Sequence, residues 1–271
     1  MSVEVLVVIG VGGMGRAIAR RIGPGKTVIL ADHHAETLQA ATEVLASEGH
    51  QVVARQVDLA SAESVAGLAR HAAEWGAVTH IAHTAGLSPS QAPAEAILAV
   101  DLLGVALVLE EFAKVVAPGG AGVIVASMAG HMLPPLAVEQ EHAMAHAPAR
   151  DLLRLPFVSP DELSDPGLAY GIAKQANHIR VRAASRSWGA RGARINAISP
   201  GVISTPMGQA ELASPLGDGM RAMVDASPAG RLGTPDDIAA AAAFLLGPEA
   251  AFITGTDLLV DGGVTGAMRH G

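Results

Sequence analysis

The sequence predicts an α/β protein with one doubly wound parallel sheet of about seven strands and helices on both faces. Apolar runs of strand length alternate along the chain with longer helical patterns. Half of the residues are hydrophobic but only 3% are aromatic, which is typical of aliphatic strands buried by Ala-rich helices. No repeat or low-complexity linker divides the chain, so we expect residues 1–271 to form a single domain.

The expected strands are the apolar runs that lie between turn signals. They cover residues 3–9, 27–31, 51–56, 78–83, 122–126, 193–198 and 257–260. The expected helices cover residues 13–22, 35–47, 61–74, 94–116, 168–188 and 235–246, the last with Thr234 as its N-cap. Because helical crossovers separate the strands, right-handed βαβ connections give a parallel sheet.

Two segments interrupt this alternation. Residues 131–166 hold six of the 16 prolines and form an expected insert near the substrate cleft, with a short helical pattern over 137–146. Residues 206–228 predict one or two short helices in a substrate loop. Both segments leave the carboxyl edge of the sheet, where ligands bind in such folds.

A glycine-rich turn follows the first expected strand and opens the first expected helix. Gly10, Gly12 and Gly15 are spaced as G-x-G-x-x-G, with Gly13 and Met14 inside the turn. Glycine lets the chain turn sharply and lets its backbone approach a pyrophosphate at the helix N-terminus. In this strand–turn–helix context the pattern predicts a Rossmann-type dinucleotide site.

An acidic residue, Asp32, lies at the end of the second expected strand. A carboxylate there accepts hydrogen bonds from the adenosine ribose and repels a 2′-phosphate, which favours NAD(H) over NADP(H). His33 follows directly and is expected to contact the cofactor.

Tyr170 is the only tyrosine in the chain, and Lys174 lies four residues later in the same helical pattern. The two side chains therefore share one helix face. A nearby ammonium lowers the pKa of a phenol, and a phenol tuned toward neutrality exchanges a proton with an alcohol oxygen. The pair predicts acid/base chemistry on an alcohol or a ketone.

Further motifs occur in a consistent order along the chain. They are Asp58-Leu59, Ala85-Gly86, the Ser-Met-Ala-Gly of 127–130, the Arg-Ile-Asn-Ala-Ile-Ser-Pro-Gly of 194–201 with Thr205, and the Gly- and Asp-containing segment 254–263. With the glycine turn, Asp32 and the Tyr170–Lys174 pair, they cover nearly the whole chain. In these motifs the sequence resembles the short-chain dehydrogenase/reductase family.

The resemblance implies roles for individual residues. Ser127 would bind the substrate oxygen, Tyr170 would be the general acid in reduction and the base in oxidation, and Lys174 would lower the tyrosine pKa and bind the nicotinamide ribose. The other cofactor contacts that the family implies are Asp58 and Leu59 at the adenine, Ala85 and Gly86 after the fourth strand, Pro200, Gly201 and Ile203 along the nicotinamide, and Thr205 near its carboxamide.

The sequence departs from the family pattern at two functional positions. The family's Asn-Asn-Ala-Gly is His-Thr-Ala-Gly here, and we interpret His83 as a structural residue at a strand end. Asp101 stands where the family has a catalytic Asn that helps to hold a proton-relay water. An ionised Asp accepts from water and pairs with Lys174, but it cannot donate a hydrogen bond.

The 43-residue separation between Ser127 and Tyr170 shows the position of the insert. An insert at this point resembles the bacterial 3α-hydroxysteroid dehydrogenase/carbonyl reductase subgroup, which implies a bulky alicyclic or aromatic ketone or alcohol. Two roles of the insert remain open: a cap on the substrate cleft, or a block to packing of the Tyr170 helix against a partner subunit.

Charge and composition exclude several other classes. The net charge is −8 and no Lys/Arg-rich block is present, so we expect no nucleic-acid partner. No apolar run reaches the roughly 18 residues of a membrane span, and residues 1–9 lack the features of a signal peptide. The absence of cysteine suits the cytoplasm. We also expect a homo-oligomer, either a dimer or a tetramer.

Histidine spacing raises the question of a metal. His142 and His146 lie four residues apart beside acidic residues, but no third convergent ligand is apparent, so we expect no metal site.

The leading hypothesis is an NAD(H)-dependent alcohol dehydrogenase or carbonyl reductase. Asp101 favours one alternative, a nucleotide-binding regulator that kept the fold but lost useful turnover. A dehydratase or epimerase on the same scaffold is a third interpretation.

Overall fold

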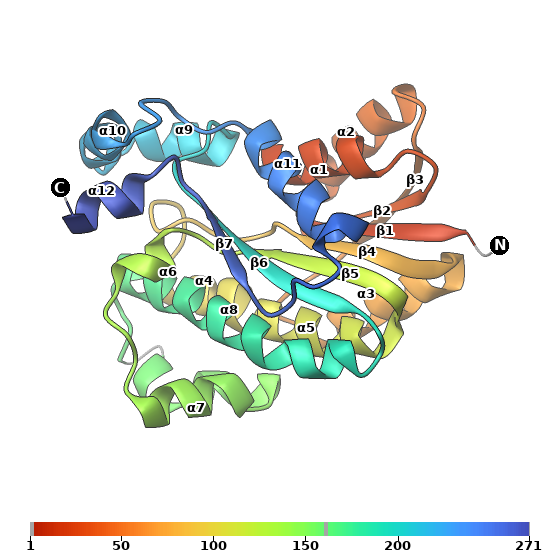
Figure 1. Ribbon diagram of the computed structural model, residues 1–271, viewed down its shortest axis with the longest axis horizontal. Coiled ribbons are helices and arrows are strands. Elements are labelled where there is room, and N and C mark those ends of the chain that lie inside the picture. The colour runs from red at the N-terminus through yellow and green to blue at the C-terminus, as the bar shows by residue number, and fades with distance from the viewer. Residues whose placement is uncertain (1–2, 160–161, 271) are drawn as a thin grey trace.

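The computed structural model describes residues 3–159 and 162–270 and contains a seven-stranded parallel sheet, as the sequence predicts (Figure 1). The strand order is β3-β2-β1-β4-β5-β6-β7. The strands are β1 (Glu4–Ile9), β2 (Thr27–Asp32), β3 (Gln51–Gln56), β4 (Ala77–His83), β5 (Val116–Val125), β6 (Arg194–Pro200) and β7 (Asp257–Val260). All neighbouring strands pair in parallel, which requires a crossover between each successive pair.

Helices cover both faces of the sheet and bury two hydrophobic cores. One face carries α1 (Gly13–Ile22), α2 (Ala35–Ser47) and α11 (Pro235–Leu246), and the other carries α3 (Ala62–Trp75), α5 (Val105–Val115) and α8 (Pro166–Gly189). The strands that lie between these layers are apolar on both faces; β1, for example, is buried from its second residue onward.

The helix expected over residues 94–116 is continuous but is not a regular α-helix throughout. It begins as α4 (Ala94–Ile97), widens into a π-helical stretch, η1 (Leu98–Gly104), and continues as α5. Asp101 lies within the π-helical stretch, where its side chain is fully buried. Such widened turns are frequent at functional sites.

The strand expected over residues 122–126 is longer in the structure. β5 begins at Val116, directly after α5, and its pairing with β4 shifts between Val78 and His80. The helical pattern therefore ends one residue earlier than predicted, and the Pro-Gly-Gly sequence after it lies in the strand.

From α7 (Val138–His146) onward, the insert packs against the outer surface of α8 and α5. It contains α6 (Ala129–Met132), which begins just before it, α7 and two 3₁₀ turns, η2 (Ala149–Arg154) and η3 (Pro156–Val158). The Arg180 guanidinium on α8 donates to the carbonyls of Met144 and Ala147 at 3.0 and 2.9 Å. Glu110 on α5 accepts from Arg180 and from the Ala149 N–H.

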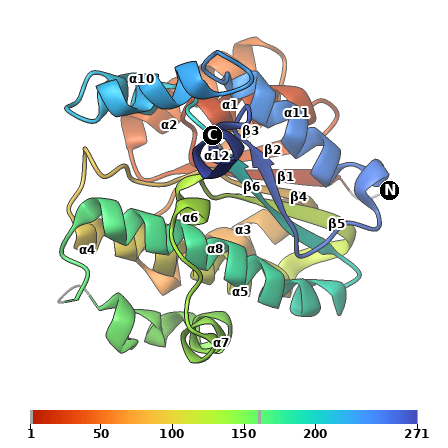
Figure 2. The same cartoon turned by 60° about the vertical axis from the view of Figure 1, so that its left-hand side comes forward.

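The expectation that the insert lies near the substrate cleft fits only its first residues, since Leu133 packs against Gly171, beside Tyr170. In both views α7 lies on the far side of α8 from α10 (Gly217–Ala226) and α12 (Val264–His270) (Figures 1 and 2). No described residue of the insert lines the cleft defined below. The physical reason is burial, because Met144, Leu152 and Val158 are fully buried in the core that α5 and α8 share. The geometry therefore disfavours the cap and fits the interpretation in which the insert covers α8.

The segment 206–228 forms the short helices α9 (Pro206–Leu212) and α10, as expected. The terminal helix α12 is an element that the sequence pattern did not predict. One further turn, η4 (Pro248–Ala250), precedes β7. In the part of the chain that the structure describes, no helix is both long and apolar enough to cross a membrane.

Candidate active site

A cleft lies at the carboxyl edge of the sheet, where β1 and β4 are neighbours and the strand order reverses. It consists of a cavity of about 780 Å³ and an adjoining one of about 520 Å³. Gly12, Thr84, Gly86 and Leu87 line both, which shows that the two cavities are continuous. A reversal of strand order is where ligands bind in open α/β sheets.

The glycines of the turn meet different steric demands. Gly10 has a φ of +88°, and a Cβ there would collide with the backbone of Ala85. A Cβ on Gly15 would collide with the Gly10 carbonyl, which places α1 directly against the turn. A Cβ on Gly12 would meet nothing within 4 Å, because this residue faces the open cleft. The backbone is thus shaped to let a ligand approach the N-terminus of α1, and the site fits a dinucleotide pyrophosphate.

Asp32 is held in place by the backbone at the end of β2. Its Oδ2 accepts from the Val11 N–H at 2.9 Å, and its Oδ1 accepts from the His34 N–H at 3.0 Å. Asp32 lines the smaller cavity together with His33, Asp58 and Leu59. This part of the cleft, which we call the adenosine end, lies over β2 and β3, on one side of the glycine turn.

Three titratable side chains meet in the larger cavity. Lys174 and Asp101 are buried, with 3% and 0% of their surface exposed, and Lys174 Nζ lies 2.9 Å from Asp101 Oδ2. The same Nζ lies 5.2 Å from the centre of the Tyr170 ring. Asp101 Oδ1 accepts the Leu87 N–H at 2.8 Å. We call this part of the cleft the catalytic end.

Gly86 is packed tightly against this group. A Cβ on Gly86 would lie 3.0 Å from Asp101 Oδ2 and 3.2 Å from Lys174 Nζ. The Ala-Gly motif after β4 therefore leaves room for the Lys174–Asp101 ion pair.

Burial dominates the electrostatics of the catalytic end. It raises the pKa of the Tyr170 phenol above its ordinary value; Lys174 and a hydrogen bond with Ser127 oppose this increase, and Asp101 adds to it. Burial also raises the pKa of Asp101, although Lys174 stabilises its charged form. Burial lowers the pKa of Lys174, but Asp101 and Tyr170 together outweigh it and hold that pKa above its ordinary value.

These shifts correct one prediction. Lys174 acts on Tyr170 in the expected direction, but the net pKa of the phenol is raised and not tuned toward neutrality. The physical reason is that a buried phenolate loses its hydration, while the Asp101 carboxylate offsets part of the Lys174 charge.

Most of the residues expected at the site do line the cleft. They are Gly10, Gly12, Gly13, Met14, Asp32, His33, Asp58, Leu59, Ala85, Gly86, Asp101, Tyr170, Lys174 and Thr205. The hydroxyl of Thr205 also caps α9 by accepting the Gly208 N–H at 3.0 Å.

The other expected residues lie behind the cleft lining. Gly15 is packed against the turn, and Ser127 acts on the site by lowering the pKa of the Tyr170 phenol. The Pro200 carbonyl accepts the Met128 N–H at 2.9 Å, which ties the end of β6 to the Ser127 segment. Gly201 and Ile203 line a separate cavity of about 210 Å³.

Several cleft residues were missed in the sequence analysis. Arg16, in the first turn of α1, and Met207, in the first turn of α9, line the larger cavity. The sequence could have indicated Arg16 as a cleft residue, because it directly follows the glycine turn. Thr84 Oγ1 donates to the Gly10 carbonyl at 2.7 Å, so a hydroxyl here braces the turn from β4. His83 is fully buried at the end of β4 and lies outside the lining.

Comparisons with known proteins agree with this geometry. The family model described as short chain dehydrogenase matches residues 4–138, and the model described as enoyl-(acyl carrier protein) reductase matches residues 136–265. The chain is 43% identical to the short-chain dehydrogenase/reductase bsc3 of Alternaria brassicicola, over 97% of this chain and 96% of that protein. It is 30% identical to a 3-alpha-hydroxysteroid dehydrogenase/carbonyl reductase of Comamonas testosteroni, over 90% and 98% of the two chains.

A solved structure shows the same fold. A short-chain dehydrogenase/reductase from Serratia marcescens superposes with a TM-score of 0.75 at 23% identity, over 97% of this chain and 98% of that one.

The fold and the cleft define a dinucleotide-binding α/β protein. The chain belongs to the short-chain dehydrogenase/reductase family and is an oxidoreductase that acts on alcohols or ketones.

Proposed function

We propose that this protein is an NAD(H)-dependent dehydrogenase/reductase that interconverts a secondary alcohol and a ketone, with Tyr170 as the acid/base. The observation that carries the proposal is the convergence of Tyr170, Lys174 and Asp101 in one cleft with the glycine turn. The bound nicotinamide supplies hydride to the ketone or accepts it from the alcohol.

The chain's own residues orient the substrate and move the proton. The Tyr170 hydroxyl gives its proton to the carbonyl oxygen in reduction and takes it back in oxidation. Ser127, which lowers the pKa of the Tyr170 phenol, would bind the same substrate oxygen. Lys174 would stabilise the phenolate and would donate to the ribose of a bound nicotinamide, and Asp101 holds its ammonium in place.

The preference for NAD(H) rests on Asp32. Two backbone N–H groups fix its carboxylate at the adenosine end, where it accepts hydrogen bonds from ribose hydroxyls. A 2′-phosphate placed there would meet a negative charge. The neighbouring contacts proposed for the adenosine are His33, Asp58 and Leu59.

We propose a bulky alicyclic ketone or alcohol as the substrate. The larger cavity, which Tyr170 lines, is also lined by the apolar side chains of Leu87, Val125 and Met207, which suit a ring system. Similar proteins include one named as acting on hydroxysteroids and one named cis-4-hydroxycyclohexanecarboxylate dehydrogenase, at 30% and 29% identity.

We further propose a cytoplasmic homo-oligomer. The outer surface of α8 carries the insert, whereas β7 is an edge strand and Phe244, Phe252 and Leu259 near it are exposed. Exposed apolar side chains beside a sheet edge favour an isologous contact there. A chain without cysteine has no disulfide to lose in a reducing compartment.

A second candidate is a nucleotide-binding regulator with weak turnover. The observation that favours it is the direct ion pair between Lys174 and Asp101. The carboxylate of Asp101 stands where the family has an Asn, whose side-chain amide can donate a hydrogen bond.

The decisive experiment titrates the full-length protein with NADH and NADPH, then follows absorbance with cyclic and aromatic ketones for wild type and Tyr170→Phe. We expect tighter NADH binding, turnover on at least one ketone, and a loss of turnover of about 1,000-fold in Tyr170→Phe with NADH binding retained. Tighter NADPH binding would contradict the role of Asp32. Binding without turnover on any ketone would favour the regulator.

A further inference from the structure

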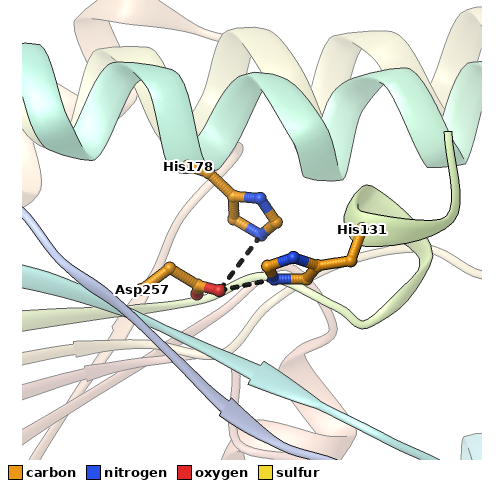
Figure 3. A group of neighbouring side chains, drawn as sticks. All are labelled: His131, His178 and Asp257. Atoms are coloured by element: carbon orange, nitrogen blue, oxygen red, sulfur yellow. Dashed lines mark hydrogen bonds and ion pairs between the residues drawn. The ribbon is translucent and has the colours of Figure 1, made fainter. Parts of the chain in front are cut away.

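Two histidines and an aspartate meet on the side of α8 that faces β7 (Figure 3). His131 comes from α6, His178 from α8, and Asp257 is the first residue of β7. His131 Nε2 lies 2.6 Å from Asp257 Oδ2, and His178 Nε2 lies 3.8 Å from the same oxygen. Among residues 3–159 and 162–270, only here do three ligand atoms of His, Asp or Glu lie within 4.8 Å of one another.

The donor set suits a first-row divalent cation. Two imidazole nitrogens and one carboxylate oxygen are a common ligand set for Zn²⁺, which binds them at about 2.0–2.2 Å. In a tetrahedral site such ligand atoms lie roughly 3.3 Å apart. The separations of the two imidazole nitrogens from Asp257 Oδ2, 2.6 and 3.8 Å, lie on either side of that value, and all three ligand atoms lie within 4.8 Å of one another.

Neighbouring groups orient the three side chains and leave them accessible. The Ser199 hydroxyl donates to Asp257 Oδ1 at 2.9 Å and lies 2.8 Å from His178 Nε2, so Oδ2 faces the histidines and His178 exchanges its hydrogen bond with Ser199 for the ion when the ion binds. Outer hydrogen bonds of this kind orient metal-binding carboxylates. The His131 side chain is 27% exposed, which leaves a path for an ion and a water.

We propose that His131, His178 and Asp257 form a site for one Zn²⁺ ion, with water as the fourth ligand. This replaces the expectation of no metal site. The sequence offered no local signal for it, because 126 residues separate His131 from Asp257. The exposed pair His142 and His146, which the sequence does single out, has no third partner among the described residues.

The site would fix the elements that carry the proposed acid/base residues. His131 follows Ser127 by four residues, and His178 follows Lys174 by four residues along α8. A Cβ on Gly130 would lie 2.7 Å from both the Gln175 backbone and the His178 ring, so α6 already packs directly on α8. The ion would clamp α6, α8 and β7 together, and it would be a positioning element rather than a participant in hydride transfer.

The test is calorimetric titration of metal-free, untagged full-length protein with Zn²⁺, for wild type, Asp257→Asn and His131→Gln. The matched control is the double variant His142→Gln/His146→Gln, which removes two imidazoles elsewhere. We expect one Zn²⁺ per chain with a Kd of about 1 μM or tighter, weakened at least about 30-fold in either site variant and unchanged in the control. Circular dichroism before each titration verifies that the variants are folded.

Wild-type protein that binds no stoichiometric Zn²⁺ up to about 100 μM would overturn the proposal. So would binding that is lost in the His142→Gln/His146→Gln control and kept in Asp257→Asn. If both site variants unfold, we would load the wild-type protein with Co²⁺ and record its visible absorption spectrum. Intense d–d absorption of a tetrahedral Co²⁺ ion supports the site, and its absence refutes it. None of these readouts requires turnover, so they stand apart from the test of the proposed dehydrogenase activity.

Discussion

The two ends of the cleft are built in different ways. The adenosine end is made largely of backbone: Gly10 with its positive φ, the open Gly12, and Asp32 held by two main-chain N–H groups. The catalytic end is made of buried charge, with Lys174 and Asp101 paired at 2.9 Å beneath Tyr170. At the adenosine end, a larger side chain would collide with the backbone or fill the cleft. At the catalytic end, removing one charge would leave the other charge buried without a partner. Substitutions at the two ends should therefore fail for different reasons.

The largest effect is expected for Lys174→Met, which leaves the Asp101 carboxylate buried without its partner. Breaking a buried pair in this way costs about 3–5 kcal/mol of unfolding free energy, and turnover should fall about 1,000-fold as well. Denaturant unfolding and kcat/KM measure the two losses. The double variant Lys174→Met/Asp101→Leu separates them: stability should recover while turnover stays low. A single variant as stable as wild type would contradict burial of the pair.

At the adenosine end, Gly12→Ala and Gly10→Ala should differ. A methyl group on Gly12 meets no neighbour, so the unfolding free energy should change by less than about 0.5 kcal/mol. The Kd for NADH should rise on the order of 100-fold, because the methyl group fills the space where backbone approaches the pyrophosphate. Gly10→Ala should destabilise the fold by about 1–3 kcal/mol in addition. Equal stability losses in the two variants would remove the distinction between them.

His83 lies at the end of β4, is fully buried and does not line the cleft. Substituting it therefore tests how burial of a histidine affects stability without changing a cofactor contact. Burial lowers the pKa of His83 to about 3, so the folded state stays neutral while the unfolded state gains a proton as the pH falls below about 6.5. The stability that the neutral form contributes is therefore present above that pH and lost below it, by about 2 kcal/mol at about pH 5.

The variant His83→Asn cannot titrate there, so its unfolding free energy should fall less between about pH 7 and pH 5 than that of wild type. Denaturant melts at several pH values measure the slope. Burial also lowers the pKa of His80, to about 4, so His80 makes the unfolding free energy of both proteins fall in acid. Parallel curves for wild type and variant would show that His83 is not the source.

Asp101→Asn keeps the shape of the catalytic end but leaves the buried Lys174 ammonium without its carboxylate, so the unfolding free energy should also fall. The smallest expected effect of this variant is a change in the pH profile. Burial raises the pKa of Tyr170 and the Asp101 carboxylate adds to that increase. Without the carboxylate, Lys174 lowers the tyrosine pKa more fully, so the rising limb of kcat/KM for alcohol oxidation should move to lower pH. A limb that stays in place or moves to higher pH would exclude this coupling.

Much of the fold could be predicted from the sequence. The seven strands, the glycine turn and the helix with Tyr170 and Lys174 lie close to where their patterns indicate, since each depends on residues only a few positions apart. The weaker predictions fell where local patterns are ambiguous. The segment after Val115 reads as the end of a helix but enters β5, and α12 has too short a pattern to stand out.

Periodicity, turn chemistry and the motif order were thus enough to determine the class of protein and the residues that line the cleft. Three features were decided only by the tertiary structure: the insert on the outer face of α8, the raised pKa of Tyr170, and the meeting of His131, His178 and Asp257. Burial sets a pKa, and crossovers of the sheet set which distant residues meet. Neither is encoded in a window of neighbouring residues, because both depend on how separate elements pack.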